Sequence, residues 1–138
     1  MGLPVHYVDL RAFCYATESE DRVREALRTV LPEDAEIDVS TGEGHHGDPI
    51  RILSARIETA DRIEAIFDRL SSGLEFSSIR DELEQRLDDN NAVYLTLEKQ
   101  KAARGTVAQG DGITLRAKIE AYPASRDRAL ENAREAFS

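Results

Sequence analysis

The N-terminal part of the chain alternates between two kinds of side chain with a period of two residues. Over residues 5–16, apolar or small side chains such as Val8 and Leu10 are separated by larger polar or aromatic ones such as Tyr7 and Arg11. Such an alternation places one set of side chains on each face of a β-strand. Similar patterns predict further strands at residues 36–40, 50–58, 93–98 and 113–121. Five strands are therefore expected.

Apolar residues recur at helical spacing between these strands. Four helices are expected, marked by Val23 to Leu31, by Ile63, Ile66, Phe67 and Leu70, by Phe76, Ile79, Leu83 and Leu87, and by Leu130, Ala133 and Phe137. Thr17 and Glu20 fit a capping box at the start of the first helix, and Pro32 ends it. Thr59 and Ser125 fit N-cap positions of the second and last helices.

The resulting order of elements is βαββααββα, which is typical of an α+β fold. Neighbouring strands that follow each other along the chain favour antiparallel pairing. We therefore expect a mainly antiparallel sheet of about five strands, with the helices packed mostly on one face. Residues 1–138 contain no linker or internal repeat and predict a single domain.

The sheet face that the helices leave open is the first candidate for function. If the apolar sides of the strands meet the helices, the other face collects Tyr7, Arg11, Phe13, Tyr15, Arg56, Tyr94, Arg116 and Lys118, and it can extend to Tyr122. Aromatic rings and guanidinium groups can stack on the bases of single-stranded RNA. The alternative is that cross-strand pairs of Tyr and Arg stabilise the sheet without binding a ligand.

The charge balance changes the expectation for partners. There are 27 acidic against 18 basic residues, for a net charge of -9, and only three of the bases are Lys. A diffuse excess of acid with little Lys favours a salt-rich cytoplasm, as in a halophilic organism, where screening weakens repulsion between carboxylates. High salt also removes long-range attraction to phosphate for any protein, so a negative charge does not exclude RNA binding.

Compartment and membrane association also follow from composition. Cys14 is the only cysteine, and a chain that forms no internal disulfide favours a reducing compartment. No run of 18 apolar residues and no signal peptide is present. A cytoplasmic protein that does not associate with membranes is expected.

Two polar segments are candidate binding sites. The loop at residues 44–49 contains His45 and His46 between glycines and a proline. Adjacent histidines in an extended segment point to opposite sides, and zinc sites usually need three or four ligands at defined spacings, so no metal is expected there. The segment at residues 98–105 is the one locally basic cluster and contains Lys99, Lys101 and Arg104. It is predicted to be a strand end that leads into a glycine-containing loop, and its cations can contact phosphates. The alternative is a solvated strand end that binds nothing.

Three segments together resemble archaeal RNA-binding proteins described as predicted exosome subunits, with an α+β fold like that of double-stranded-RNA-binding domains or ribosomal proteins. They are residues 5–18, the histidine loop at residues 43–50, and residues 86–100. The resemblance implies no catalysis and no cofactor, and it places His45, His46, Lys99 and Gln100 on an RNA surface.

The expected function is a non-catalytic RNA-binding protein of a halophilic archaeon, associated with RNA processing by the exosome or with ribosomal proteins. His45, His46, Lys99, Gln100, Lys101 and Arg104 would contact the RNA backbone, and Tyr7, Arg11 and Phe13 would stack with bases. The RNA is structured or single-stranded, and DNA is not expected as a partner. The alternative is a protein–protein adaptor with a structural histidine loop, and an enzyme is the third reading.

Overall fold

The computed structural model describes residues 2–43, 47 and 49–138, and shows a five-stranded antiparallel sheet. The strands are β1 (Val5–Cys14), β2 (Asp38–Glu43), β3 (Pro49–Ile57), β4 (Ala92–Glu98) and β5 (Gly112–Ile119). Their order across the sheet is β2-β3-β1-β5-β4, and every neighbouring pair is antiparallel. The predicted number of strands and their antiparallel arrangement are confirmed.

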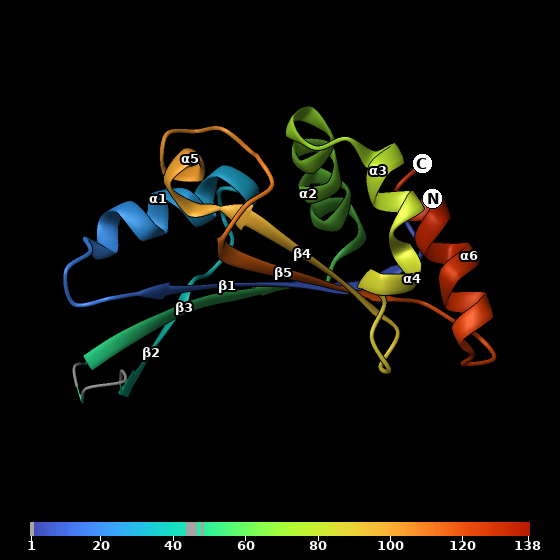
Figure 1. The fold of residues 1–138 in the computed structure, drawn as a ribbon, viewed down its shortest axis with the longest axis horizontal. Helices are drawn as coiled ribbons and strands as arrows, with labels where there is room; N and C mark the ends of the chain where they lie inside the picture. The colour runs from blue at the N-terminus through green and yellow to red at the C-terminus, as the bar shows by residue number, and fades with distance from the viewer. Residues whose placement is uncertain (1, 44–46, 48) are drawn as a thin grey trace.

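The helices lie on one side of this sheet (Figure 1). They are α1 (Glu20–Val30), α2 (Ala60–Gly73), α3 (Phe76–Asp81), α4 (Leu83–Arg86), α5 (Lys99–Ala103) and α6 (Arg126–Ala136). No helix within the described residues crosses the opposite face, which is called the open face below. The predicted α+β class with helices on one face is therefore confirmed. None of the described helices is both long and apolar enough to cross a membrane.

The hydrophobic core lies between the sheet and the helices, and the period-2 pattern of the strands builds its floor. Leu10 of β1 lies in register with Ala55 of β3 and with Leu115 of β5, and all three are buried. The helices complete the core with their apolar stripes, and the rings of Phe67 and Phe137 lie 5.1 Å apart. Among the described residues no polar or charged residue is fully buried, so the charged groups are at the surface.

Two predicted elements differ from the structure. The third helix, expected over residues 76–87, is two short helices, α3 and α4, which meet at Glu82. The segment expected as a strand end and loop forms a one-turn helix, α5, between β4 and β5. The Glu98 carboxylate accepts a hydrogen bond from the Lys101 backbone N–H (2.6 Å) and so caps this turn. The element order is therefore βαββαααβαβα.

The predicted caps are partly correct. Ser125 is the N-cap of α6, where its Oγ accepts a hydrogen bond from the Arg128 backbone N–H. The capping box at Thr17 and Glu20 is wrong, because α1 begins at Glu20 and Ser19 is its N-cap. The Glu20 side chain accepts hydrogen bonds from Arg24 and Arg51 instead, and the bond with Arg51 is the main reason that the pKa of Glu20 is lowered.

Candidate nucleic-acid interface

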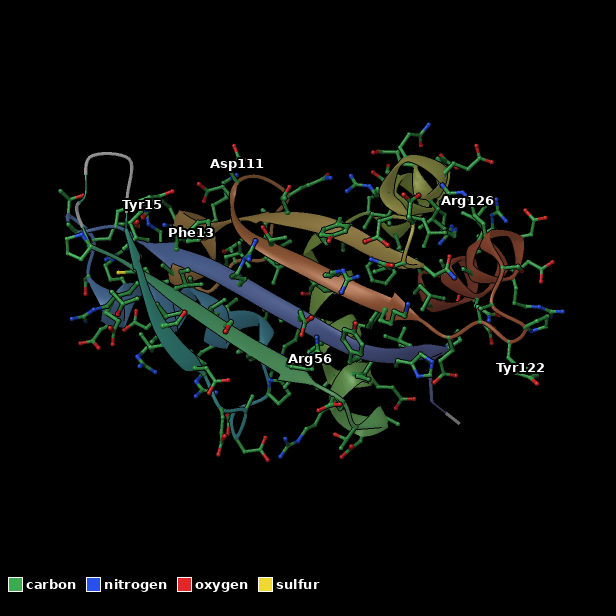
Figure 2. All side chains as sticks on the ribbon, turned by 90° about the horizontal axis from the view of Figure 1, so that it is seen from below. Phe13, Tyr15, Arg56, Asp111, Tyr122 and Arg126 are labelled. Atoms are coloured by element: carbon green, nitrogen blue, oxygen red, sulfur yellow. The ribbon has the colours of Figure 1, made fainter. Side chains whose placement is uncertain are left out.

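The open face carries side chains from four strands that the sequence places far apart (Figure 2). Rows run across the sheet because the strands are in register. Tyr94 of β4 is paired with Arg116 of β5, which is paired with Asp9 of β1, which is paired with Arg56 of β3. A second row contains Thr96, Thr114, Arg11 and Ser54. The face therefore alternates between cations, acids and aromatic rings, on a rigid scaffold.

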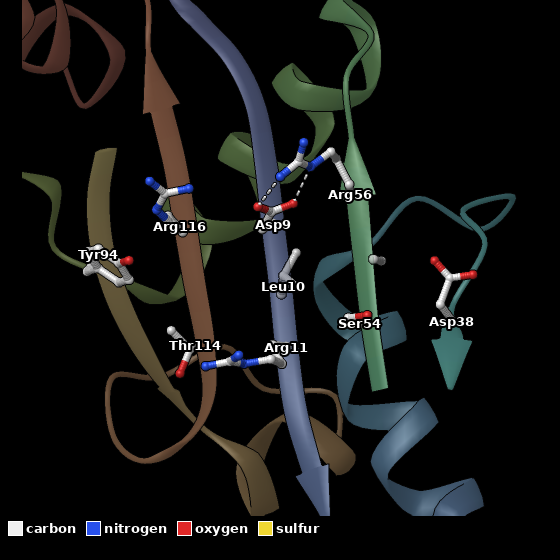
Figure 3. A pocket seen from close by; sticks show the side chains of 10 residues that line it. Asp9, Leu10, Arg11, Asp38, Ser54, Arg56, Tyr94, Thr114 and Arg116 are labelled. Atoms are coloured by element: carbon white, nitrogen blue, oxygen red, sulfur yellow. Dashed lines mark hydrogen bonds and ion pairs between the residues drawn. The ribbon is translucent and has the colours of Figure 1, made fainter. Parts of the chain in front are cut away.

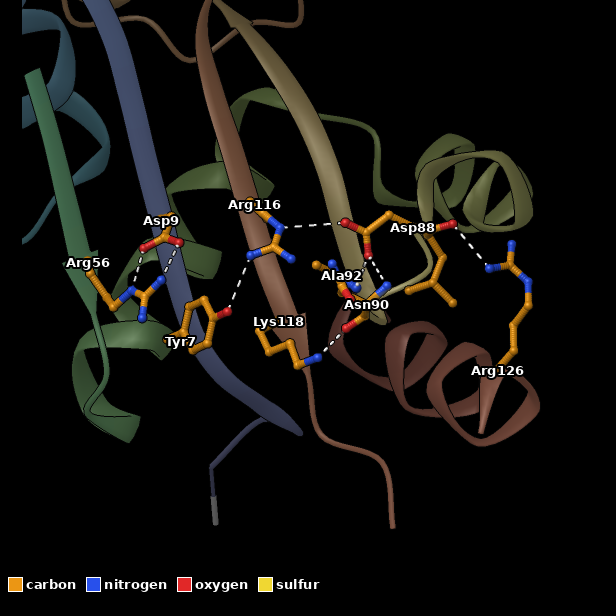
Figure 4. Close-up of polar contacts among 10 residues, drawn as sticks. Tyr7, Asp9, Arg56, Asp88, Asn90, Ala92, Arg116, Lys118 and Arg126 are labelled. Atoms are coloured by element: carbon orange, nitrogen blue, oxygen red, sulfur yellow. Dashed lines mark hydrogen bonds and ion pairs between the residues drawn. The ribbon is translucent and has the colours of Figure 1, made fainter. Parts of the chain in front are cut away.

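Asp9 and Arg56 form a bidentate ion pair in the first row (Figures 3 and 4). Arg56 Nε and Nη2 donate to the two carboxylate oxygens at 2.7 and 2.9 Å. The guanidinium carbon of Arg56 also lies 3.9 Å from the centroid of the Tyr7 ring. The hydrogen bonds with Asp9 are the main reason that the pKa of Arg56 is raised. Arg56 thus covers one face of Tyr7, and half of its own side chain stays exposed.

Arg116 connects this cluster to the turn before β4 (Figure 4). Its Nη1 donates to the Tyr7 hydroxyl at 3.3 Å, and its Nε lies 3.6 Å from Oδ2 of Asp88. Asp88 Oδ1 accepts hydrogen bonds from the backbone N–H groups of Asn90 and Ala92, both at 2.9 Å. Burial raises the pKa of Asp88, but these two hydrogen bonds and the charge of Arg116 outweigh it and lower the pKa below its ordinary value. Arg116 is therefore largely neutralised by Asp88.

A hollow of about 400 Å³ lies in the centre of the open face (Figure 3). Its lining comes from all five strands and includes Asp38, Arg56, Tyr94 and Arg116, and Arg11 lines it beside Thr114 (Figure 3). Arg11 makes no hydrogen bond or ion pair with any residue that the structure describes, and its guanidinium lies 5.5 Å from the centroid of the Phe13 ring. It is therefore a cation that a ligand can reach without breaking an internal pair.

Exposed aromatic rings flank the hollow. Phe13 is 38% exposed and Tyr94 is 40% exposed, although side chains of this size are usually more buried. Tyr15 follows the end of β1, is 49% exposed, and has its ring centroid 6.4 Å from that of Phe13. Exposed rings on a regular sheet next to a free guanidinium group are the arrangement that stacks nucleobases.

The basic cluster predicted at residues 98–105 is divided by the structure. Lys99 is only 12% exposed, and its Nζ donates to the Glu18 carboxylate at 2.8 Å and to the Phe13 carbonyl at 3.0 Å. Gln100, Lys101 and Arg104 are exposed. Helix α5 packs against α1, and Thr29 of α1 donates to the Ala102 carbonyl at 2.6 Å. Lys99 therefore holds elements together, whereas the other three residues face solvent.

His45 and His46 lie outside the described residues. The strands on either side of their loop, β2 and β3, end where Glu43 pairs with Pro49. Antiparallel pairing brings Glu43 and Pro49 to the same end of the sheet as the C-terminal ends of β1 and β4, where Phe13 and Lys99 lie. Among the predicted site residues that the structure describes, Phe13 and the residues of α5 and its C-cap lie at this end, and α5 is on the helix side of the sheet. Tyr7 lies towards the other end of β1, and Arg11 lines the central hollow.

The sequence analysis assigned no binding role to Arg56, Arg116 or Tyr94, although it placed them on this face. Their mutual contacts depend on strand register, which a period-2 pattern does not provide. No group of three or more His, Cys, Asp or Glu side chains within the described part of the chain could hold a metal ion.

The chain is similar to known proteins over nearly its whole length. A family model described as RNA binding matches residues 7–119. An RNA-binding protein of Pyrococcus abyssi, PAB1135, is 31% identical over 96% of this chain and 94% of its own length. The crystal structure of protein AF2318 from Archaeoglobus fulgidus superposes with a TM-score of 0.86 at 31% identity, over 96% of this chain and 99% of that one. A structure from Methanothermobacter thermautotrophicus has a TM-score of 0.83 at 36% identity, over 97% and 98% of the two chains.

Proposed function

This chain belongs to a family of RNA-binding proteins with archaeal members, and from that premise we propose that it binds RNA through the open face of its sheet. The observation that carries the proposal is the central hollow, where Arg11 has no partner among the described residues and exposed rings lie on either side. Each exposed ring also lies beside a guanidinium group, Phe13 at 5.5 Å from Arg11 and Tyr94 at 5.8 Å from Arg116. Rings and guanidinium groups together are the surfaces on which bases stack.

The residues have different roles in this proposal. Arg11 binds phosphate or stacks on a base, and Phe13 stacks on a base. Tyr7 contributes mainly through its edge, because Arg56 covers one face of its ring. Gln100, Lys101 and Arg104 form a second contact that fixes the RNA backbone at the end of the sheet. We place His45 and His46 at that same end as donors to phosphate or to ribose hydroxyl groups.

Finer features of the function are also proposals. We infer a non-catalytic role in association with RNA-processing or ribosomal assemblies, including the exosome, in the cytoplasm of a halophilic archaeon. The acidic composition supports the halophilic origin, because high salt screens the repulsion between exposed carboxylates. RNA binding that rests on stacking and hydrogen bonds persists under the same conditions. Copurification of tagged protein with exosome or ribosomal subunits, before and after nuclease treatment, tests the assembly.

A filter-binding titration with archaeal ribosomal and transfer RNA fragments, in KCl from 0.1 to about 2 M, tests RNA binding itself. The variant Arg11→Gln is expected to weaken binding about 5- to 30-fold, as the loss of a charge-assisted contact of about 1–2 kcal/mol would. The matched control is Arg134→Gln, which removes an exposed cation from α6 in the helical layer. Equal effects of the two variants, or no retention of any RNA, would contradict the proposal.

A further inference from the structure

The charges of the open face are mostly paired within the protein. Asp9 neutralises Arg56, and Asp88 neutralises Arg116. Lys118 donates to the Asn90 carbonyl, which leaves its charge uncompensated, and Arg11 has no partner among the described residues. Two uncompensated cations on a molecule of net charge -9 are a poor surface for a duplex, which proteins recognise mainly through phosphates and ribose hydroxyl groups.

The exposed rings, in contrast, lie at a separation that suits a short unpaired tract. Tyr94 lies in the row of Asp9, two strands away from β1, and Phe13 lies four residues further along β1. With strands about 4.8 Å apart and about 3.4 Å per residue, the two positions are roughly 16 Å apart on a diagonal. At a stacked rise of about 3.4 Å per nucleotide, that diagonal spans at most about five nucleotides.

The space between the two rings can accept bases. Arg11, Thr114 and Arg116 line the hollow between them, and the exposed guanidinium group of Arg11 offers a flat surface and N–H donors, whereas Arg116 is largely buried. In a duplex the bases are stacked on one another inside the helix, so they cannot reach rings that lie within a shallow hollow.

We propose, building on the RNA-binding function above, that the open face binds single-stranded RNA of about four or five nucleotides, running diagonally from Tyr94 across Arg11 to Phe13. Bases stack on the two rings and the backbone passes Arg11. Lys118 lies two residues beyond Arg116 on β5, on the side away from Phe13, and contacts a phosphate at the Tyr94 end of the tract. Binding depends only moderately on salt, with a slope of log affinity against log salt of about -1 to -2, since two cations are uncompensated and each contributes about -0.7.

Fluorescence of a single introduced tryptophan tests stacking directly, because the chain has no tryptophan of its own. The tryptophan fluorescence of Phe13→Trp and of Tyr94→Trp should decrease when unlabelled U6 or A6 RNA is added, because a base that stacks on the indole quenches it. Tyr122→Trp is the matched control: Tyr122 is 93% exposed and follows β5 outside the hollow, so its emission should not change. Equal quenching at all three positions, or none at positions 13 and 94, would overturn the proposal.

Affinity measurements provide the second test. Phe13→Leu and Tyr94→Leu should weaken binding of the hexamers about 5- to 150-fold each, corresponding to about 1–3 kcal/mol per stacked base. Tyr94→Phe should retain affinity because it keeps the ring, and Tyr122→Leu should bind like the unmodified chain. Circular dichroism melts of each variant verify that these exposed substitutions leave the fold intact.

The same hexamers annealed to their complements separate this inference from the proposed function. Tighter binding of the single strands, with the ring dependence above, supports the inference. If the duplex binds as well as the single strands, the choice of single-stranded RNA is overturned while RNA binding stands. If neither form binds at any salt concentration, both proposals fail.

Discussion

Arg56 is held between a carboxylate and an aromatic ring, so what it offers to RNA depends on Asp9. The bidentate geometry fixes the guanidinium plane over Tyr7, but the acid cancels its charge. Both partners are partly exposed to water, and exposed ion pairs typically contribute about 0–1 kcal/mol to stability. The pair therefore matters more for the orientation of Arg56 than for the free energy of unfolding.

Asp9→Asn tests this division of roles. It should lower the free energy of unfolding by no more than about 1 kcal/mol. RNA affinity at low salt should rise, and its dependence on log salt should become steeper by about 0.7, because Arg56 then contributes an additional positive charge to the open face. Asp127→Asn on α6 removes the same charge away from this face. An equal rise in affinity for both variants would mean that only net charge matters.

The contacts of Asp88 predict how the free energy of unfolding depends on pH. Its pKa is lower in the folded protein than the ordinary value of about 3.9, so the ionised carboxylate contributes full stability above that value. This contribution is lost as the pH falls through the lower, folded pKa. Asp88→Asn should cost roughly 1 kcal/mol at pH 7, and the difference from the unmodified chain should shrink in urea titrations as the pH falls below the ordinary carboxyl pKa of about 3.9.

Asp89→Asn is the control for this measurement, because Asp89 is exposed in the same turn. It should leave stability nearly unchanged at every pH. A difference between Asp88→Asn and the unmodified chain that stays constant as acid is added would contradict the proposed role of the carboxylate charge.

At the scale of elements, the periodicity of apolar residues predicts the strands and their buried faces, but it does not predict very short helices or contacts between distant segments. The five strands and the polarity of their two faces follow from alternation, because one buried face dictates every second residue. The split of the third helix at Glu82 and the single turn of α5 are not visible in the sequence, because one turn of helix has too few residues to show a period. The contacts of Lys99 with Glu18 and Phe13 join segments more than 80 residues apart, which no local pattern encodes.

The cations in and next to helix α5 are expected to act in two different ways, one on RNA affinity and one on stability. For an RNA longer than the hexamers that also reaches α5, replacing the exposed pair Lys101 and Arg104 with Gln should reduce the magnitude of the salt slope by about 1.4, with little change in stability. Lys99→Gln should instead lower the melting temperature, because it removes a hydrogen bond to the Phe13 carbonyl and the ion pair with Glu18. Its salt slope should stay nearly unchanged, since Glu18 already neutralises Lys99.

Salt titrations of RNA binding together with thermal melts of the same variants check both effects. A Lys99→Gln variant that flattens the slope as much as the double variant would show that Lys99 contacts RNA, as the sequence analysis expected. That outcome would require the ion pair with Glu18 to open when RNA binds.

At the scale of the whole molecule, the net charge of -9 is spread over a surface where every charged residue that the structure describes is at least partly exposed. Repulsion between like charges opposes the compact state, and added salt screens it over a Debye length of about 10 Å at 0.1 M and about 3 Å at 1 M. If the chain is adapted to a salt-rich cytoplasm, the melting temperature should rise by several degrees between 0.1 and about 2 M KCl at pH 7.

The same titration at pH 5 is the control, because the sequence pI is about 4.8 and the net charge there is small. The rise should then be much weaker, since little repulsion is left to screen. An equal rise at both pH values would assign the effect to exclusion of salt from the protein surface, and a fall at pH 7 would show that the exposed ion pairs outweigh the repulsion.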